Sequence, residues 1–247
     1  MRFYTNVQMV GDQILVRGYE NGRRFMNRES FNPTLFVPAK GKSKFKTLEG
    51  EYVSPVQPGS IRETRDFIKK YDGVDGFKIF GFERFIYQYI ADNYQEDHIE
   101  FDMSKINLIT IDIETKAEYG FPDVESAAEE MLLITIQDFN TKQIITWGVG
   151  PFDNNQDNVD YRQFPDEKAM LNGFIHWWID NTPDVVTGWN CEFFDLPYLA
   201  GRLARVLGDK LMKRLSPWGL VTKQEVFVMG RKNFCVDVGG VAILAYM

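Results

Sequence analysis

The sequence predicts an α/β (α+β) protein in which a mixed-sheet domain follows a smaller, β-rich α+β domain. Residues 1–104 open with short alternating strands separated by tight turns, which is typical of a β-meander. Residues 105–247 contain three strands, a helix, a strand and a helix, an order that favours a mixed sheet packed against helices. With 44% hydrophobic residues, a chain of 247 residues can bury a sizeable core.

The first domain, residues 1–104, is expected to begin with three strands. They are expected at residues 2–10, 13–19 and 23–31, with Gly11-Asp12 and Asn21-Gly22 as the turns. Ser60 and Glu63 form a capping box before an amphipathic helix that ends near Tyr71, and a second helix is expected at 84–94. This half contains no cluster of ligands, bases or nucleophiles, so a structural or docking role is predicted.

The pattern resets before residue 105, where the second domain begins. Strands are expected at 106–113, 131–137, 143–149 and 184–187. The helix between the last two begins after Asp166, a typical N-cap, and a second helix follows Asp195 and Pro197. A hairpin is expected at 225–238.

Composition restricts the chemistry that is available. Two cysteines and two histidines cannot form a disulfide framework or a Cys/His zinc site, so any metal must bind to oxygen ligands. The chain has neither an apolar run of about 20 residues nor a secretory signal. We therefore expect a cytoplasmic protein that makes no membrane contact.

Charge is unevenly distributed around a net value of -7. Residues 105–195 hold 5 Lys/Arg against 17 Asp/Glu, whereas residues 196–233 hold 8 against 2. Carboxylates gathered around cations beside a bound polyanion would produce this asymmetry. A mosaic of solvated faces would produce it as well, and both interpretations remain open.

Two short segments carry candidate chemistry. In the strand Ile109–Thr115 the isoleucines share one face, so Asp112 and Glu114 share the other, where a divalent cation would relieve their repulsion. A polar face in water would show the same pattern. The second segment, residues 188–197, follows a strand at the edge where open α/β sheets bind ligands. In this segment Asp195 is either a site carboxylate or the N-cap of the next helix.

Together these segments resemble the 3′ to 5′ proofreading exonuclease domain of the family B DNA polymerases, which is of the ribonuclease H-like, DEDD type. Asp112-Ile113-Glu114-Thr115 resembles the first exonuclease motif, and Asn190-x-x-x-Phe194-Asp195 resembles the second. Residues 187–190, residues 213–217 and the hairpin bring the chain nearest to the replicative polymerases of T4-like bacteriophages.

This resemblance implies a site with two Mg²⁺ or Mn²⁺ ions. Asp112 would bridge the ions, Glu114 would ligate one and orient the attacking water, and Asp195 would hold the other. The implied substrate is the single-stranded 3′ end of primer-template DNA. The side chains expected to contact this DNA are Asn190, Phe121, Phe194, Arg202, Arg231 and Lys232, although core packing or solvent exposure would also explain most of them.

The chain departs from the family at the third exonuclease motif, Tyr-x-x-x-Asp. The letters occur at Tyr119 and Asp123, too close to Glu114 to serve, and no later copy follows. We therefore expect either that a second polypeptide carries this motif and the polymerase domains, or that the chain is a fragment cut before its last strand and helix; the sequence leaves both open. Two alternatives remain: a free-standing DEDD nuclease acting on DNA or RNA, and a non-catalytic nucleic-acid-binding assembly domain of a split polymerase.

Overall fold

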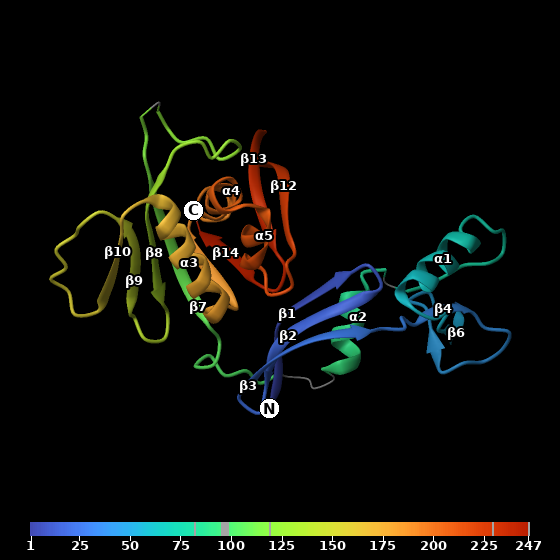
Figure 1. Cartoon of the computed structure of the whole chain (residues 1–247). Helices are drawn as coiled ribbons and strands as arrows, with labels where there is room; N and C mark the ends of the chain where they lie inside the picture. Colours follow the sequence, from blue (N-terminus) through green and yellow to red (C-terminus); the bar gives the residue numbers. More distant parts are fainter. Residues whose placement is uncertain (82, 95–98, 119, 229, 247) are drawn as a thin grey trace. The chain divides into compact units, whose positions relative to one another are not determined.

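The computed structural model forms two compact units, Met1–Phe101 and Asp102–Met247 (Figure 1). The structure describes all residues except 82, 95–98, 119, 229 and 247, and it leaves out the side chain of Arg231. That the two units are a separate N-terminal domain and an exonuclease domain cut before its third motif remains a prediction.

The first unit contains two small antiparallel sheets. Strands β1 (Arg2–Val10), β2 (Gln13–Glu20) and β3 (Arg23–Ser30) pair in that order, as the alternating pattern predicted. A second sheet, which the sequence analysis did not predict, has the order β4-β6-β5. Its strands are β4 (Leu35–Pro38), β5 (Phe45–Lys46) and β6 (Tyr52–Val56).

Two helices complete this unit, and their ends follow local rules. In α1 (Ile61–Tyr71) the Ser60 hydroxyl accepts from the Glu63 N–H, and the Glu63 carboxylate accepts from the Ser60 N–H at 2.7 Å. The predicted capping box is therefore confirmed. Helix α2 (Phe85–Asn93) buries Phe85 and Tyr89 in the core of the unit.

The second unit is built on a six-stranded mixed sheet with the order β10-β9-β8-β7-β11-β14. The strands are β7 (Leu108–Thr115), β8 (Met131–Asp138), β9 (Ile144–Val149), β10 (Val159–Phe164), β11 (Val185–Trp189) and β14 (Ala242–Tyr246). Strand β7 runs antiparallel to β8 and parallel to β11. The mixed sheet is as predicted, whereas the edge strands β10 and β14 were not predicted from the sequence.

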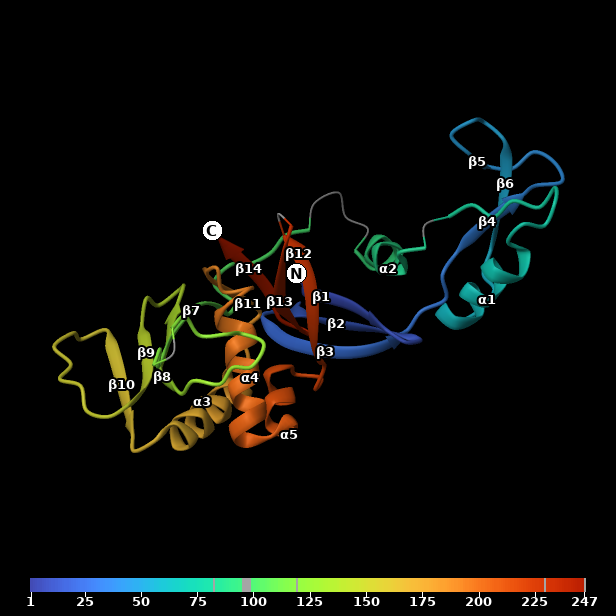
Figure 2. The ribbon, with the colours of Figure 1, turned by 90° about the horizontal axis from the view of Figure 1, so that it is seen from above.

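Helices cover this sheet and enclose its core. Figures 1 and 2 show α3 (Glu167–Asn181) alongside β8 to β10, while α4 (Asp195–Leu207) contacts β7. Asp166 caps α3 as expected, with its carboxylate accepting from the Ala169 N–H at 2.8 Å. Fully buried rings, among them Trp147, Phe174 and Trp178, fill the space between the helices and the sheet.

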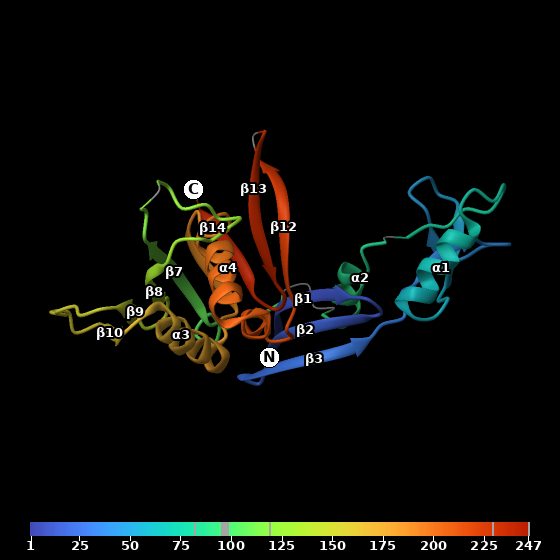
Figure 3. The ribbon, with the colours of Figure 1, turned by 45° about the horizontal axis from the view of Figure 1, so that its top comes forward.

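A short helical segment and a hairpin follow α4. They comprise α5 (Asp209–Met212), the 3-10 helix η1 (Lys213–Leu215), β12 (Val221–Val228) and β13 (Arg231–Val238). The hairpin contacts α4 through β13 and lies beside that helix (Figure 3). Its antiparallel pairing confirms the predicted hairpin and extends it toward the N-terminus by four residues, from Glu225 to Val221. In the part of the chain that the structure describes, no helix is long and apolar enough to cross a membrane.

Candidate metal and nucleic-acid site

Strand β7 separates its apolar and acidic side chains as its alternation predicted. Ile111 and Ile113 are 2% and 5% exposed, and they pack into the core. Asp112 and Glu114, between and after them, are exposed on the other face. Because successive side chains of a strand point to opposite faces, the two carboxylates leave the sheet on the same side.

The second motif occupies the turn between β11 and α4. Asn190 adopts the left-handed conformation with φ of 51°, which asparagine tolerates better than most residues. Its carbonyl accepts from the N–H groups of Phe193 and Phe194, both at 3.1 Å. Since β7 and β11 are parallel, this turn leaves the sheet at the edge where Glu114 lies.

Asp195 joins the two motifs. Its side chain is 4% exposed, and its Oδ1 accepts a hydrogen bond from the Ile113 N–H at 3.0 Å. Ile113 lies between Asp112 and Glu114 in the sequence, so the buried carboxylate is held at the backbone between the two acidic side chains. The alternative that Asp195 caps α4 is wrong: Phe194 occupies the N-cap position, and the Asp195 carboxylate is engaged with β7.

Burial and like charge make the ionised form of Asp195 unfavourable. Burial is the largest cause that raises the pKa of its carboxyl from 3.8 to about 6, followed by the negative charge of Asp112 and then that of Glu114. The N–H of Ile113 opposes this shift by stabilising the carboxylate. A cation beside these groups would remove the repulsion.

The donor set suits a hard divalent cation, because all three side chains offer carboxylate oxygen. Within the described residues, however, no group of three or more His, Cys, Asp or Glu side chains has the geometry of a metal site. The structure brings Asp195 to the strand that carries Asp112 and Glu114, but it does not show a closed coordination sphere.

Two of the predicted aromatic residues come together beside Asp195. Phe121, in the loop after β7, is 85% exposed, and its ring centroid is 5.2 Å from that of Phe194. A second exposed aromatic pair, which was not predicted from the sequence, is Trp189 and Tyr246, whose ring centroids are 5.9 Å apart at the ends of β11 and β14. In the sequence, the position of Trp189 directly before Asn190 of the second motif was the feature that could have marked it as a candidate site residue.

The basic candidates differ in their surroundings. Arg202 is 5% exposed and forms a buried ion pair with Glu167. In this structure its guanidinium is therefore not accessible to DNA. Lys232 is exposed on β13 and pairs with Glu225 at 3.0 Å. The side chain of Arg231 lies outside the described part of the chain.

A six-stranded mixed sheet with acidic side chains at the end of a central strand is the architecture of a ribonuclease H-like nuclease domain. The family described as DNA polymerase family B, exonuclease domain, matches residues 83–244. The chain therefore belongs to the family B DNA polymerases and contains their exonuclease domain, which confirms the resemblance drawn from the two motifs.

Individual relatives agree with this assignment. The DNA-directed DNA polymerase of Enterobacteria phage T4 is 30% identical over 99% of this chain and 30% of its own length. That of Escherichia phage RB69 is 26% identical over the same shares, and the DNA polymerase of Archaeoglobus fulgidus is 20% identical over 75% of this chain and 24% of its own. The chain thus spans about 30% of the length of the two phage polymerases.

Proposed function

We propose that this chain is the N-terminal and exonuclease portion of a family B DNA polymerase, and that it removes nucleotides from the 3′ end of single-stranded DNA during proofreading. The observation that carries the proposal is the hydrogen bond from Ile113 to Asp195, which unites the two acidic motifs at one edge of the sheet. The proposed place of action is the cytoplasm, that of the host if the chain is phage-encoded.

Asp112, Glu114 and Asp195 would hold Mg²⁺ or Mn²⁺. Two such ions, when bound, activate water and stabilise the attacking and leaving oxygens of an in-line displacement at phosphorus. In this proposal Asp112 would contribute to holding both ions, Glu114 would hold one and orient the water, and Asp195 would hold the other. Of the three carboxylates only that of Asp195 is buried, and it accepts a hydrogen bond from the backbone of β7.

A frayed 3′ end presents unstacked bases and a flexible backbone. The exposed ring of Phe121, supported by Phe194, offers a stacking surface that accepts any base. Asn190 lies in the turn between that surface and the end of β11. We assign Lys232 and Arg231 of the hairpin to the backbone of primer-template DNA, and we leave Arg202 out of this interface.

We further propose that a second polypeptide supplies the fourth carboxylate from a Tyr-x-x-x-Asp segment, together with the polymerase domains. The internal candidate, Asp123, follows Glu114 too closely in the sequence to serve, and its carboxylate accepts from the Ser126 N–H within its own loop at 2.8 Å. The chain alone should then bind metal but hydrolyse DNA slowly, since an error of about 1 Å in positioning costs roughly a hundredfold in rate.

The test is degradation of a 5′-labelled single-stranded oligonucleotide with Mg²⁺ or Mn²⁺. The chain alone should shorten it from the 3′ end weakly or not at all. Addition of the polypeptide that carries the downstream Tyr-x-x-x-Asp segment should raise the rate by orders of magnitude. Asp112→Ala is the control that should abolish the restored activity.

Three outcomes would contradict the proposal. Rapid cleavage by the isolated chain that Asp112→Ala abolishes would show that no second polypeptide is needed. Metal-dependent cleavage of RNA in preference to DNA would favour a free-standing nuclease instead. Absence of any cleavage with the partner present would favour a non-catalytic assembly role.

A further inference from the structure

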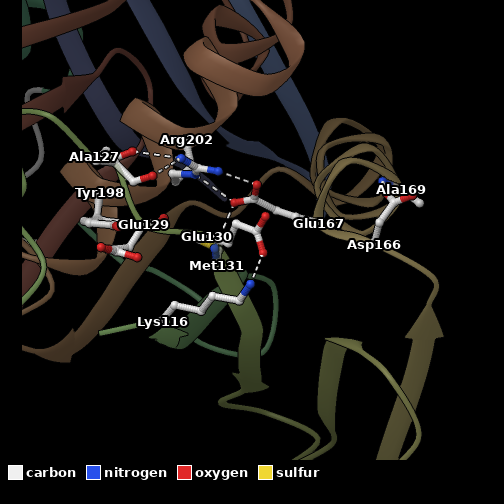
Figure 4. Close-up of polar contacts among 11 residues, drawn as sticks. Lys116, Ala127, Glu129, Glu130, Met131, Asp166, Glu167, Ala169, Tyr198 and Arg202 are labelled. Carbon is white, nitrogen blue, oxygen red and sulfur yellow. Dashed lines mark hydrogen bonds and ion pairs between the residues drawn. The ribbon is translucent and has the colours of Figure 1, made fainter. Parts of the chain in front are cut away.

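One buried charge pair lies outside the catalytic carboxylates but adjoins the segment that follows them. Arg202 makes four hydrogen bonds that occupy its guanidinium: Nε and Nη2 donate to the two carboxylate oxygens of Glu167, and Nη1 donates to the carbonyls of Ala127 and Ala128 at 3.0 and 2.9 Å. Glu167 also accepts from the Met131 N–H at 2.8 Å. Figure 4 shows Arg202 between Ala127 and Glu167.

The two alanine partners of Arg202 belong to the loop of residues 116–130, which connects β7 to β8 and of which the structure describes residues 116–118 and 120–130. The ends of this loop are joined at Lys116 and Glu130, through a backbone hydrogen bond of 2.8 Å and an ion pair of 2.6 Å (Figure 4). Ala127 is buried with φ of 42°, a conformation that a residue with a Cβ adopts only when its surroundings hold it. Gly201 permits the close approach, because a Cβ there would lie 2.7 Å from that of Ala127.

Helix α4 connects this loop to the site. Its first residue is Asp195, and Tyr198 and Arg202 follow at helical spacing on the side that meets the loop. The Tyr198 hydroxyl donates to the Glu129 carbonyl at 2.8 Å, and its ring lies 5.6 Å from that of Phe194. Phe194 in turn contacts Phe121. The loop is therefore attached to α4 in two places. Near the C-terminal end of the loop, Tyr198 and Arg202 donate to its backbone carbonyls, and at Phe121 the exposed ring contacts Phe194.

We propose that the Arg202–Glu167 pair positions the loop of residues 116–130 so that Phe121 stands beside Phe194 to receive the terminal base of single-stranded DNA. This inference rests on the proposed function. Arg202 is suited to the task because its planar fork can bind a carboxylate and two carbonyls at once, which the single ammonium of lysine cannot do. Arg202 is thus a positioning residue that acts through Phe121 without touching DNA.

The test uses the full chain with Arg202→Lys, which keeps the charge in the buried site. Hydrogen exchange of residues 117–130 should become at least about tenfold faster, because the carbonyls and the carboxylate lose their shared donor. Exchange in the hairpin of residues 221–238 should not change. Arg205→Lys is the matched control: the same substitution at an exposed position of the same helix should leave both segments as they are.

Binding of 5′-fluorescein-(dT)12 in EDTA then tests the route through Phe121. Phe121→Ala should weaken binding about tenfold, the cost of losing one stacked base, and Arg202→Lys should approach that loss. The double variant should bind no more than about twofold weaker than Phe121→Ala alone, because both changes remove the same contact.

Several results would overturn the inference. Unchanged exchange and affinity in a folded Arg202→Lys variant would show that the pair does not hold the loop, and additive losses in the double variant would show that Arg202 acts by another route. If Arg202→Lys does not fold, Glu167→Gln is measured against the same criteria. Failure of the unaltered chain to bind (dT)12 would overturn the proposed function, whereas hydrogen exchange would still decide whether Arg202 holds the loop.

Discussion

Asp195 has opposite effects on stability and on the proposed chemistry. A buried carboxylate near two other acids destabilises the folded chain unless a cation is bound, yet the same crowding gives a cation its binding energy. Nuclease sites that collect like charges are expected to reduce the stability of the metal-free protein for this reason. The pH dependence of stability exposes this effect.

Asp195→Asn should stabilise the metal-free chain at neutral pH. Because folding raises the pKa of this carboxyl from 3.8 to about 6, the folded state binds the proton more tightly than the unfolded state. The contribution of this carboxyl to the stability of the folded chain is therefore fully present below about pH 4 and is lost as the pH rises through about 6. Asparagine keeps an oxygen for the Ile113 N–H. The free energy of unfolding of the variant, taken relative to that of wild type, should therefore be about 3 kcal/mol larger above pH 7 than at pH 4.

Thermal or urea unfolding in EDTA between pH 4 and pH 8 measures this difference. Asp153→Asn, the same substitution at an exposed loop position, serves as the control and should show no such trend. A stability difference between wild type and Asp195→Asn that is the same at both ends of the pH range would contradict the account.

Asp112→Ala should weaken Mn²⁺ binding more than Glu114→Ala or Asp195→Ala does. Asp112 alone is assigned to both ions, so its removal should cost at least about tenfold in affinity. Calorimetric titration of the four proteins with Mn²⁺ gives the comparison, with Asp153→Ala as the exposed control. A larger loss from Glu114→Ala would mean that the ligand roles are assigned wrongly.

At the scale of elements, the site depends on the close parallel contact between β7 and β11. Gly188 of β11 lies where a Cβ would meet the Ile111 carbonyl at 2.6 Å and the Cβ of Cys191 at 3.0 Å. Neither neighbour is the end of a flexible side chain, so a larger residue must displace a strand. That displacement would carry the Asn190 turn away from Asp112 and Glu114.

Gly188→Ala should therefore destabilise the chain by about 2 kcal/mol and weaken Mn²⁺ binding as well. Urea unfolding and metal titration of the same variant measure the two effects. Gly41→Ala is the matched control, because a Cβ at Gly41 meets nothing within 4 Å. If Gly188→Ala lost stability but bound Mn²⁺ normally, the strand contact would not control the site.

At the scale of the whole molecule, each unit has a hydrophobic core of its own. The core of the second unit is made of residues between 109 and 245, and that of the first unit of residues between 4 and 99. A fragment of residues 102–247 should therefore fold cooperatively and bind Mn²⁺ within about twofold of the full chain. A fragment of residues 1–101 should bind none.

Calorimetry on both fragments tests this division, and unfolding by urea shows whether each fragment is folded. A folded 102–247 fragment that binds no Mn²⁺ would show that the first unit contributes to the metal site. Loss of stability without loss of metal binding would agree with a supporting role for the first unit.

The sequence by itself determined the features that local rules govern. Alternation in Ile109–Thr115 set which side chains of β7 are buried, and the Ser60–Glu63 capping box set the start of α1, because each depends on residues a few positions apart. The two acidic motifs were also recognisable, since each is a short run of residue types. These patterns were enough to indicate a mixed sheet and to select Asp112, Glu114 and Asp195.

Only the tertiary structure decided how distant segments use their polar groups. The pattern of α4 allowed Asp195 to cap its own helix and Arg202 to face solvent or phosphate. In the folded chain Asp195 bonds to Ile113, 82 residues away, and Arg202 to Glu167, 35 residues away. Local periodicity carries no information about such partners, because a buried charge is stabilised by whichever groups the packing of sheet and helices brings beside it.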